Sequence, residues 1–379
     1  MQIPFHASAG PSLGIEVELE LIDLRTGQLA SHASDILAQL GAGHPDGLHP
    51  KAKHELFECC VEIITGVCTT VAEARADLEA TLAEVRRAAG ERSLTVICSG
   101  SHPFSLWGEQ RVSPNERYDR LVHEMQWMAR RLQIFGVHVH VGVRSAEKAI
   151  VVANALANHI PHFLALTASS PFWEGHDTGL ASTRSKVFEG LPTAGLPAPV
   201  HSWAEFEQYM STLVAAGAIS TVREVWWDVR PHPDFGTVEL RMCDGIPTMV
   251  EIASIAALAQ SLVAHVDRLD DEGRAPERLR EWILGENKWR AGRHGLDAQL
   301  IVDDGGTLVP AREAIESLVA SVRPEADALG CRTELDGISQ ILEAGPSYER
   351  QRAISDGGTN LWAVVDLLAR ELSSGRIGG

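Results

Sequence analysis

The sequence predicts an α+β protein built on a mostly antiparallel sheet. Four segments alternate apolar residues with Glu, His or Arg, which is typical of strands that bury one face and keep the other polar. Segments with helical spacing of Ala, Leu and Val lie between strands, and the chain beyond about residue 247 is expected to be mainly helical. Because no internal repeat or low-complexity linker is present, residues 1–379 are expected to form a single domain.

The predicted elements alternate along the first two thirds of the chain. Strands are expected at residues 12–22, 56–65, 93–100, 134–143, 224–233 and 236–242. Helices are expected at residues 31–40, 70–92, 115–133 and 146–170. The segment from Ala181 to Trp203 is interrupted by Gly and Pro, which predicts a long loop, and such loops in compact domains are usually functional.

Composition excludes several classes of function. The chain has 33 Lys and Arg against 51 Asp and Glu, a formal net charge of -18, and no local basic patch. Such a charge repels nucleic acid and anionic membrane surfaces. The N-terminus does not look like a secretory signal, the apolar runs are interrupted by polar residues, and the six cysteines form no CxxC pair. We therefore expect a cytoplasmic protein that binds neither nucleic acid nor membrane.

The segment GIEVELELI, residues 14–22, places Glu16, Glu18 and Glu20 on one face of a strand, and we call these three residues the acidic row. Residues two apart in a strand are separated by roughly 7 Å. At an effective dielectric constant of about 20, two carboxylates at that distance repel each other by roughly 2 kcal/mol. The acidic row must therefore either face water or hold cations, and taken alone it favours neither.

Three other predicted strands also have one polar face. The polar residues are Glu58 and Glu62 in LFECCVEI, His138 and His140 in GVHVHVGV, and Glu239 and Arg241 in GTVELRM. If all four strands belong to one sheet, their polar faces converge into a cluster that is rich in carboxylates and poor in thiols. Such a set of ligands suits Mg²⁺ or Mn²⁺ better than a structural zinc ion. Divalent cations held by carboxylates are typical partners of nucleotide phosphates.

Basic residues that could bind phosphate are also present. Arg184 and Lys186 lie in the Gly/Pro-rich loop, and Arg230 ends the segment WWDVR. Arg241 is the strongest candidate, because its position two residues after Glu239 would place it beside metal-bound phosphate. The sequence has no P-loop motif, no dinucleotide-binding glycine pattern, no zincin motif and no G-x-S-x-G elbow. Any nucleotide is therefore expected to bind by other means.

Eight motifs follow one another over nearly the whole chain. They are LGIEVELEL, ELFECCVEIIT, GSHPFSLW, NERYDRL, FGVHVHVGV, SSPFWEGHDTGLASTRSKVFEGLP, WWDVRPHPDFGTVELRMCD and ISDGGT. Each is weak alone, but the ordered set resembles the carboxylate-amine ligase family, also called glutamate-cysteine ligase type 2. The resemblance implies a glutamine-synthetase-like fold. In that fold a curved antiparallel sheet holds ATP and two or three Mg²⁺ (or Mn²⁺) ions on its concave face, and helices pack on the outer face.

The resemblance also implies roles for individual residues. The residues that look like metal ligands are Glu16, Glu18, Glu58, Glu62, His138 and Glu239. Those that resemble contacts to the transferring phosphoryl group are His140, Arg184 and Arg241. Those similar to members of the ATP and substrate pocket are Lys186, Arg230, Asn115, Arg117, Tyr118 and Trp227. Glu20 has no clear counterpart, so we expect it either behind the metal ligands or facing solvent.

The implied reaction transfers the γ-phosphoryl group of ATP to a substrate carboxylate, and an amine then attacks the acyl phosphate to give an amide. By analogy with the family, L-glutamate would be activated at its γ-carboxylate and L-cysteine would be the amine, which gives γ-glutamylcysteine and ADP. The alternatives are the same chemistry on a different acid or amine, a metal-dependent amide hydrolase, and a non-catalytic nucleotide sensor. Relatives also suggest a homodimer.

Overall fold

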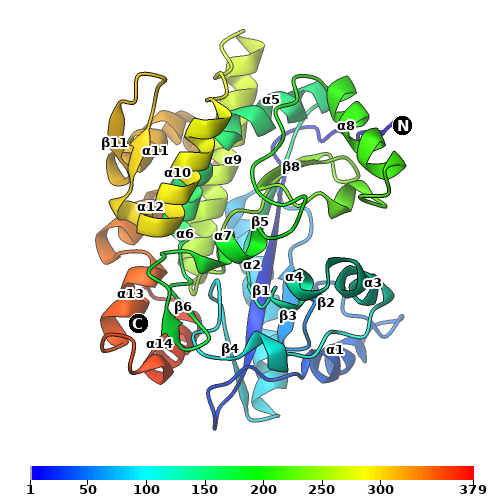
Figure 1. Cartoon of the computed structure of the whole chain (residues 1–379), viewed down its shortest axis with the longest axis vertical. Coiled ribbons are helices and arrows are strands. Elements are labelled where there is room, and N and C mark those ends of the chain that lie inside the picture. The colour runs from blue at the N-terminus through cyan, green and yellow to red at the C-terminus, as the bar shows by residue number, and fades with distance from the viewer. Residues whose placement is uncertain (1) are drawn as a thin grey trace.

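The computed structural model describes residues 2–379 and is built around a seven-stranded sheet (Figure 1). The strand order is β2-β3-β1-β5-β9-β8, with β4 beside β1. The strands are β1 (Leu13–Asp23), β2 (Ala52–His54), β3 (Cys60–Ile64), β4 (Leu94–Ile97), β5 (Val137–Gly142), β8 (Val229–His232) and β9 (Thr237–Leu240). Every pairing in this sheet is antiparallel, which confirms the predicted α+β class.

The long strand β1 organises the sheet because it pairs with three neighbours, β5, β3 and β4. The alternate residues Ile15, Val17, Leu19 and Leu21 are buried in the main hydrophobic core. Burial of each such aliphatic side chain contributes about 1.5–3 kcal/mol to stability. This burial commits one face of β1 to the core and leaves the opposite face to the glutamates.

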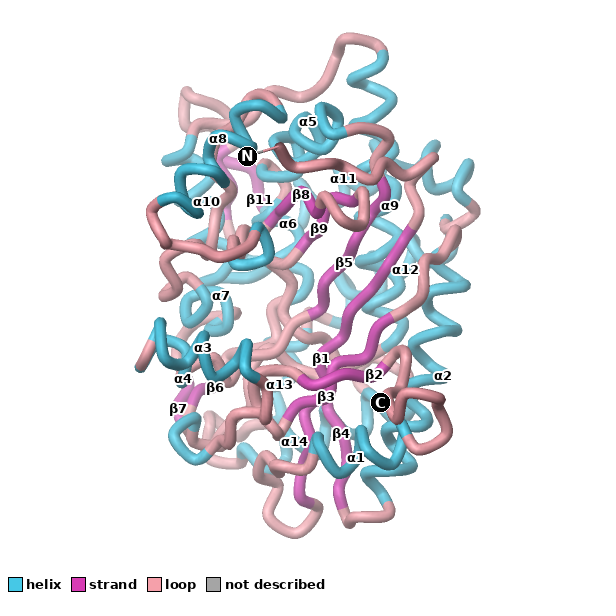
Figure 2. The backbone as a smooth tube through the Cα atoms, turned by 90° about the vertical axis from the view of Figure 1, so that its right-hand side faces the viewer, coloured by secondary structure: helices cyan, strands magenta, loops and turns pink. Residues whose placement is uncertain are grey.

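Helices cover the apolar face of the sheet. In Figure 2, α2 (Val71–Gly90) and α9 (Met249–Asp271) lie on one side of the strands, and both contact β1. Helix α2 begins with a capping box between Thr70 and Glu73, which satisfies backbone amides that have no partner within the helix. Helix α9 has the length and hydropathy of a membrane span, but 83% of its most apolar window is buried inside the protein. It is therefore a core helix.

The remaining elements surround this central unit. Further helices are α1 (Ala33–Gly41), α3 (Glu116–Met125), α4 (Trp127–Arg130), α5 (Ala146–Ala157), α6 (Ile160–Thr167), α7 (Thr183–Phe188), α8 (Trp203–Ala215), α10 (Glu281–His294), α11 (Ala311–Leu329), α12 (Arg332–Ala344), α13 (Ser347–Ile354) and α14 (Leu361–Ser374). Short 3₁₀ turns are η1 (Trp107–Glu109), η2 (Val222–Glu224) and η3 (Gly295–Asp297). Two small hairpins pair β6 (Phe172–Trp173) with β7 (His176–Asp177) and β10 (Gln299–Ile301) with β11 (Leu308–Pro310).

Two predicted helices are broken, several predicted strands are shorter than expected, and the loop expected at residues 181–203 contains helix α7. The helix expected at residues 115–133 is divided by Gln126, whose positive φ of 49° ends α3 and starts α4. The helix expected at residues 146–170 is divided into α5 and α6, which are bent by 60°. Strand β3 starts only at Cys60, because the Cys60 amide donates to the carbonyl of Phe57 and closes a tight turn.

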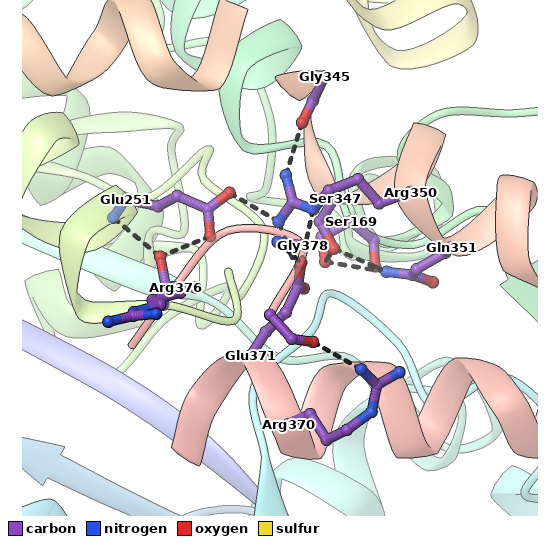
Figure 3. A network of polar contacts seen from close by, with 12 residues as sticks. Ser169, Glu251, Gly345, Ser347, Arg350, Gln351, Arg370, Glu371, Arg376 and Gly378 are labelled. Atoms are coloured by element: carbon purple, nitrogen blue, oxygen red, sulfur yellow. Dashed lines mark hydrogen bonds and ion pairs between the residues drawn. The ribbon is translucent and has the colours of Figure 1, made fainter. Parts of the chain in front are cut away.

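Buried ion pairs tie the C-terminal helices to α9 (Figure 3). Arg350 on α13 donates through Nη2 to Glu251 on α9 at 2.9 Å and through Nε to Glu371 on α14 at 2.8 Å. The Gly378 amide also donates to Glu371, at 2.7 Å, which fastens the end of the chain. Because an unpaired buried charge is costly, the loss of any one partner would destabilise the whole C-terminal region.

Candidate active site

A cavity of about 290 Å³ lies on the polar face of the sheet. Strands β1, β3, β5, β8 and β9 contribute to its floor, and residues of α3 and α7 contribute to its walls. The predicted site residues that line it are Glu16, Glu18, Glu62, Arg117, Tyr118, His138, His140, Arg184, Arg230, Glu239 and Arg241. Residues far apart in the sequence are therefore brought to one cavity.

The pairing register of the strands places their polar residues side by side. The opposed pairs are Glu18 with Glu62, Glu16 with His138, His140 with Glu239, and Glu239 with Arg230. Directly opposed residues in an antiparallel pair share a face of the sheet. The polar face of β1 therefore continues across β3 on one side and across β5, β9 and β8 on the other.

Three of these residues, Glu16, His138 and Glu239, form a group that we call the first ligand set. One ligand atom from each lies within 4.8 Å of the other two, which is a suitable spacing for one metal ion. His138 Nδ1 is 3.1 Å from Glu16 Oε2. His140 Nε2 is 3.5 Å from Glu16 Oε1 and 3.7 Å from Glu239 Oε1, so this imidazole lies directly beside the set.

The protonation states of the first ligand set suit metal binding. Burial raises the pKa of Glu16, but His138 and His140 outweigh it and hold that pKa well below its usual range. Burial raises the pKa of Glu239 as well, but the charges of Arg230 and Arg241 outweigh burial and hold that pKa well below its usual range. Burial lowers the pKa of His138 to about 4, so its imidazole is neutral near pH 7. Deprotonated carboxylates and a neutral imidazole are the forms that bind metal.

A second acidic group consists of Glu18, Glu55 and Glu62, all of which line the cavity. Burial, and then the charge of Glu55, raises the pKa of Glu18 to about 8. Burial and neighbouring carboxylates also raise the pKa of Glu62 well above its usual range, and burial raises that of Glu55. The nearest cation to Glu62 is Lys53 Nζ, at 3.7 Å from its Oε2. Charges of Arg184, Arg241 and Arg117 also act on Glu18 or Glu55. Within residues 2–379 only the first ligand set brings its ligand atoms close enough together for one ion, so the second acidic group is an acidic wall of the cavity.

Glu55 was not predicted, and Glu58 was predicted in its place. Alternation through residues 56–65 assigned Glu58 to the polar face, but the tight turn before Cys60 breaks that alternation. The Glu58 carboxylate instead accepts from the Ser34 hydroxyl at 2.6 Å and the Ser34 amide at 3.2 Å, in the first turn of α1. Glu58 therefore lies outside the cavity. Only the closeness of Glu55 to the strand hints at it in the sequence.

The acidic row also divides along β1. Glu16 and Glu18 reach the cavity, whereas Glu20 is fully buried and accepts from the hydroxyl and amide of Ser99 at 2.7 and 3.1 Å. Burial raises the pKa of Glu20 to about 8. Of the two positions expected for Glu20, the structure excludes the one that faces solvent.

Arginines cover the first ligand set. Arg230 donates from Nε and Nη2 to Glu239 Oε2 at 3.0 and 2.7 Å, and Arg241 forms an ion pair with Glu239 Oε1. Both Nη atoms of Arg184, on α7, donate to the carbonyl oxygen of Arg241 at 3.3 Å. Within residues 2–379, Nε of Arg184 and Nε of Arg241 have no hydrogen-bond partner. Both guanidinium groups therefore keep capacity for an anion.

Two predicted pocket residues lie on helices and do not line the cavity. Lys186 points away along α7, where its Nζ lies 2.8 Å from Glu189 Oε2 and 5.4 Å from the centre of the Trp289 ring. Asn115 is the N-cap of α3, and its side chain accepts from the Arg117 amide at 2.9 Å. Its oxygen is therefore engaged in starting the helix that carries Arg117 and Tyr118.

The third predicted ATP and substrate pocket residue outside the cavity is Trp227. It is buried, and its ring lies 5.2 Å from that of Tyr209 and 6.1 Å from that of Phe206 on α8. Its neighbour Trp226 lines the cavity instead. Adjacent residues of an extended chain point in opposite directions, so only one indole of this pair can reach the site.

Other residues of the cavity were not predicted. His232 and Phe235 stack with ring centres 4.1 Å apart, and the His140 ring lies 5.6 Å from each of them. Arg223 lines the same side. Apolar side chains form another wall: Leu121, Leu132, Ile134, Phe188 and Leu191. The cavity therefore combines a charged floor with aromatic and aliphatic walls, as small-molecule sites commonly do.

Solved structures share this architecture. The chain aligns with a bifunctional glutathione synthetase from Pasteurella multocida with a TM-score of 0.70 and 14% identity, over 96% of this chain and 52% of that one. It aligns with the glutamate–cysteine ligase of Francisella tularensis, solved with AMP, with a TM-score of 0.70 and 12% identity, over 98% of this chain and 90% of that one. At these identities the likeness shows the fold alone, and that fold is glutamine-synthetase-like.

Sequence comparison identifies the family. The model of glutamate-cysteine ligase family 2 matches residues 12–358. A protein of Frankia casuarinae, provisionally named glutamate–cysteine ligase 2-1, is 53% identical over 99% of both chains. A Thermobifida fusca protein, provisionally named glutamate–cysteine ligase 2, is 48% identical over 99% of this chain and 94% of its own.

Fold, site and relatives together define the class of protein: an ATP-dependent carboxylate-amine ligase. Within that class, the chain belongs to glutamate-cysteine ligase family 2.

Proposed function

We propose that the protein joins the γ-carboxylate of L-glutamate to the amine of L-cysteine, with conversion of ATP to ADP and phosphate. One observation carries the proposal: the first ligand set lies beside Arg241, Arg184 and His140, which together could hold a phosphoryl group. The relatives' names support the choice of glutamate and cysteine as substrates. A homodimer and a cytoplasmic location remain predictions, as does the treatment of residues 1–379 as one catalytic unit.

Two divalent cations, Mg²⁺ or Mn²⁺, fit the carboxylates. Glu16, His138 and Glu239 would hold one of them, because their ligand atoms already converge. Glu18, Glu55 and Glu62, which line the same cavity but converge less closely, would supply ligands to the other. A third ion, which the family resemblance allows, would need ligands from substrate or water. When bound, such ions neutralise phosphate charge and orient the groups that react.

The protein's own residues would then orient the substrates and balance their charge. Arg184 and Arg241 would bind oxygens of the γ-phosphoryl group, because each has an unpaired buried Nε. Burial lowers the pKa of His140, but the charges of Glu239 and Glu16 outweigh burial, so the net pKa is raised. Its imidazolium would add a further positive charge. Arg117 on α3 also lines the cavity and would bind a substrate carboxylate.

The walls of the cavity would protect the acyl phosphate from water until the amine arrives. Tyr118 is buried and its hydroxyl donates to the carbonyl of His54 at 3.0 Å, which fixes the ring beside the second acidic group. Phe188 lies on the same helix as Arg184, 5.7 Å from its guanidinium carbon, and closes the other wall. Exclusion of water favours aminolysis over hydrolysis of the activated acid.

The test is an assay of phosphate release with mass analysis of products. Purified protein is incubated with Mg²⁺, ATP and L-glutamate, and amines are added singly, with cysteine first. Formation of γ-glutamylcysteine with stoichiometric ADP would support the proposal. A glutamyl amide with another amine would overturn the choice of cysteine, and amide cleavage without ATP would overturn the ligase reaction in favour of a hydrolase. Binding of ATP without turnover under any pairing would favour the nucleotide sensor.

A further inference from the structure

Asp244 is a buried carboxylate four residues after the end of β9, and the proposed chemistry does not use it. It is 0% exposed and does not line the cavity. Its Oδ2 accepts from the Ser169 amide at 2.9 Å and from the Ser170 hydroxyl at 2.7 Å, and its Oδ1 accepts from the Ser182 hydroxyl at 2.8 Å. Three donors from two separate segments therefore converge on one side chain.

Both hydroxyls hold the first turn of α7. Ser182 is the N-cap, and its Oγ accepts from the Ser185 amide at 3.2 Å while donating to Asp244. Ser170 Oγ accepts from the Arg184 amide at 3.0 Å while donating to Asp244. A hydroxyl has one proton, so a donor bond to the carboxylate leaves its lone pairs for the amides of α7. Asp244 thereby orients both hydroxyls.

The other end of Arg184 is attached to the same segment. Its Nη atoms donate to the carbonyl of Arg241, which precedes Asp244 by three residues. The backbone of Arg184, through Ser170, and its guanidinium are therefore both attached to residues 241–244. That segment directly continues β9, the strand that carries Glu239. It therefore fixes the position of Arg184 relative to the first ligand set.

The surroundings leave Asp244 little freedom. A Cβ added at Gly100 would lie 2.5 Å from Asp244 Oδ2, so the carboxylate packs directly on that glycine. Ser169 is held in turn by Gln351 Nε2, which donates to its carbonyl at 2.9 Å, and by Ser347, whose Oγ is 3.0 Å from its own (Figure 3). Asp244 therefore joins α7 to a rigid, fully buried polar network.

We propose that Asp244 is a positioning residue that sets the place of Arg184 through Ser170 and Ser182. This inference rests on the proposed role of Arg184 in binding the phosphoryl group. A displacement of about 1 Å in a catalytic group can cost roughly 100-fold in rate. The position of α7 is therefore a condition for turnover, although Asp244 never touches substrate.

A double-mutant cycle in the full-length protein tests the proposal. Asp244→Asn keeps the side-chain volume but replaces one acceptor oxygen by a donor, so at least one of the three donors loses its partner. We expect Asp244→Asn to lower kcat about 10- to 100-fold and Arg184→Ala to lower it about 100- to 1,000-fold. The double variant should be no slower than Arg184→Ala within about twofold, because Asp244 acts through Arg184. Independent, multiplicative losses would overturn the proposal.

A milder variant and a matched control separate positioning from general stability. Ser170→Ala removes only the hydroxyl between Asp244 and the Arg184 amide, and it should also lower kcat if Asp244→Asn does not fold. Glu325→Gln alters another buried carboxylate, which accepts from His265 and Arg268 away from the cavity. This control should lower the melting temperature and leave kcat unchanged. If Ser170→Ala and Glu325→Gln affect kcat equally, the positioning role is refuted.

The outcome also distinguishes this inference from the proposed function. If Arg184→Ala retains full turnover, the proposed role of Arg184 fails and the positioning proposal fails with it. If Arg184→Ala is inactive while folded Asp244→Asn keeps wild-type kcat and KM for ATP, only the positioning proposal is overturned.

Discussion

Arg230 and Glu239 face each other across β8 and β9, and two guanidinium nitrogens of Arg230 donate to the single oxygen Oε2 of Glu239. Arg230 also donates through Nη1 to the carbonyl of Val225 at 2.8 Å. The guanidinium group of Arg230 is thus fixed on two sides. It orients the Glu239 carboxylate so that Oε1 lies toward Arg241 and His140.

This relationship predicts the effect of Arg230→Lys. Lysine has no planar fork that can direct two N–H groups at one carboxylate oxygen, so Glu239 would lose its orientation. Loss of such a supporting contact typically costs about 10- to 100-fold in metal affinity. Titration of Mn²⁺ by electron paramagnetic resonance should show a loss of this size. The carbonyls of Arg223 and Val225 would also lose their donor, which should lower the melting temperature. Wild-type affinity in Arg230→Lys would contradict the role given to Arg230.

Glu18→Gln should abolish ATP turnover without unfolding the protein. It removes a ligand of the second cation, but it also removes a buried carboxylate whose ionisation is unfavourable. At pH 9 we therefore expect the metal-free variant to melt at a higher temperature than the metal-free wild type. Calorimetry with a chelator present, together with the phosphate-release assay, measures both effects. Full activity of Glu18→Gln would show that Glu18 is not a ligand of a catalytic cation.

Stability of the metal-free protein should fall as pH rises. The pKa of Glu18 is raised in the folded protein from 4.5 to about 8, so its contribution to stability is fully present below pH 4.5 and is lost as pH rises through about 8. Mg²⁺ binds the deprotonated form, so its stabilising effect should increase over the same interval. The difference in melting temperature between wild type and Glu18→Gln, with and without Mg²⁺, isolates this group. A difference that does not change with pH would refute the prediction.

Glu55 and Glu58 should respond differently to the same substitution. Glu55→Gln removes a carboxylate from the cavity and should reduce turnover at least about 100-fold, as expected for a group that helps hold a catalytic metal. Glu58→Gln weakens the contact to Ser34 at the start of α1 and should cost about 1 kcal/mol of stability while leaving turnover within a few fold. Steady-state kinetics and urea unfolding of the two variants give the comparison. If Glu58→Gln lowered turnover more than Glu55→Gln, Glu58 would be the carboxylate of the site, as strand alternation predicted.

Trp226 and Trp227 form a second matched pair. Trp227→Ala empties a buried position among the aromatics of α8 and should destabilise the protein by about 3–5 kcal/mol. Trp226→Ala changes a cavity wall and should mainly alter KM for ATP or the acid substrate. Denaturant unfolding and initial-rate kinetics separate the two. Equal effects on stability would contradict the opposite orientation of the two indoles.

Much of the site could be predicted because strand periodicity is a local property. Residues two apart share a face whatever the strand pairs with, so alternation in β1, β5 and β9 was enough to place Glu16, His138 and Glu239 each on the polar face of its own strand. The prediction failed where the backbone departs from that period. The turn closed by Cys60 and Phe57 moves Glu58 out of the cavity and brings Glu55 into it.

The sequence by itself determined the faces of the strands, the α+β class and the identity of the ligand-type side chains, because these follow from hydrophobic period and residue chemistry. Only the tertiary structure decided which strands are neighbours, that Glu16 lies opposite His138, and that Arg184 reaches the carbonyl of Arg241. The reason is physical. Register and helix placement minimise the free energy of contacts between residues more than a hundred positions apart, as for Glu16 and His138. A local pattern fixes which residues share a face of a strand, but not which distant strand lies beside it.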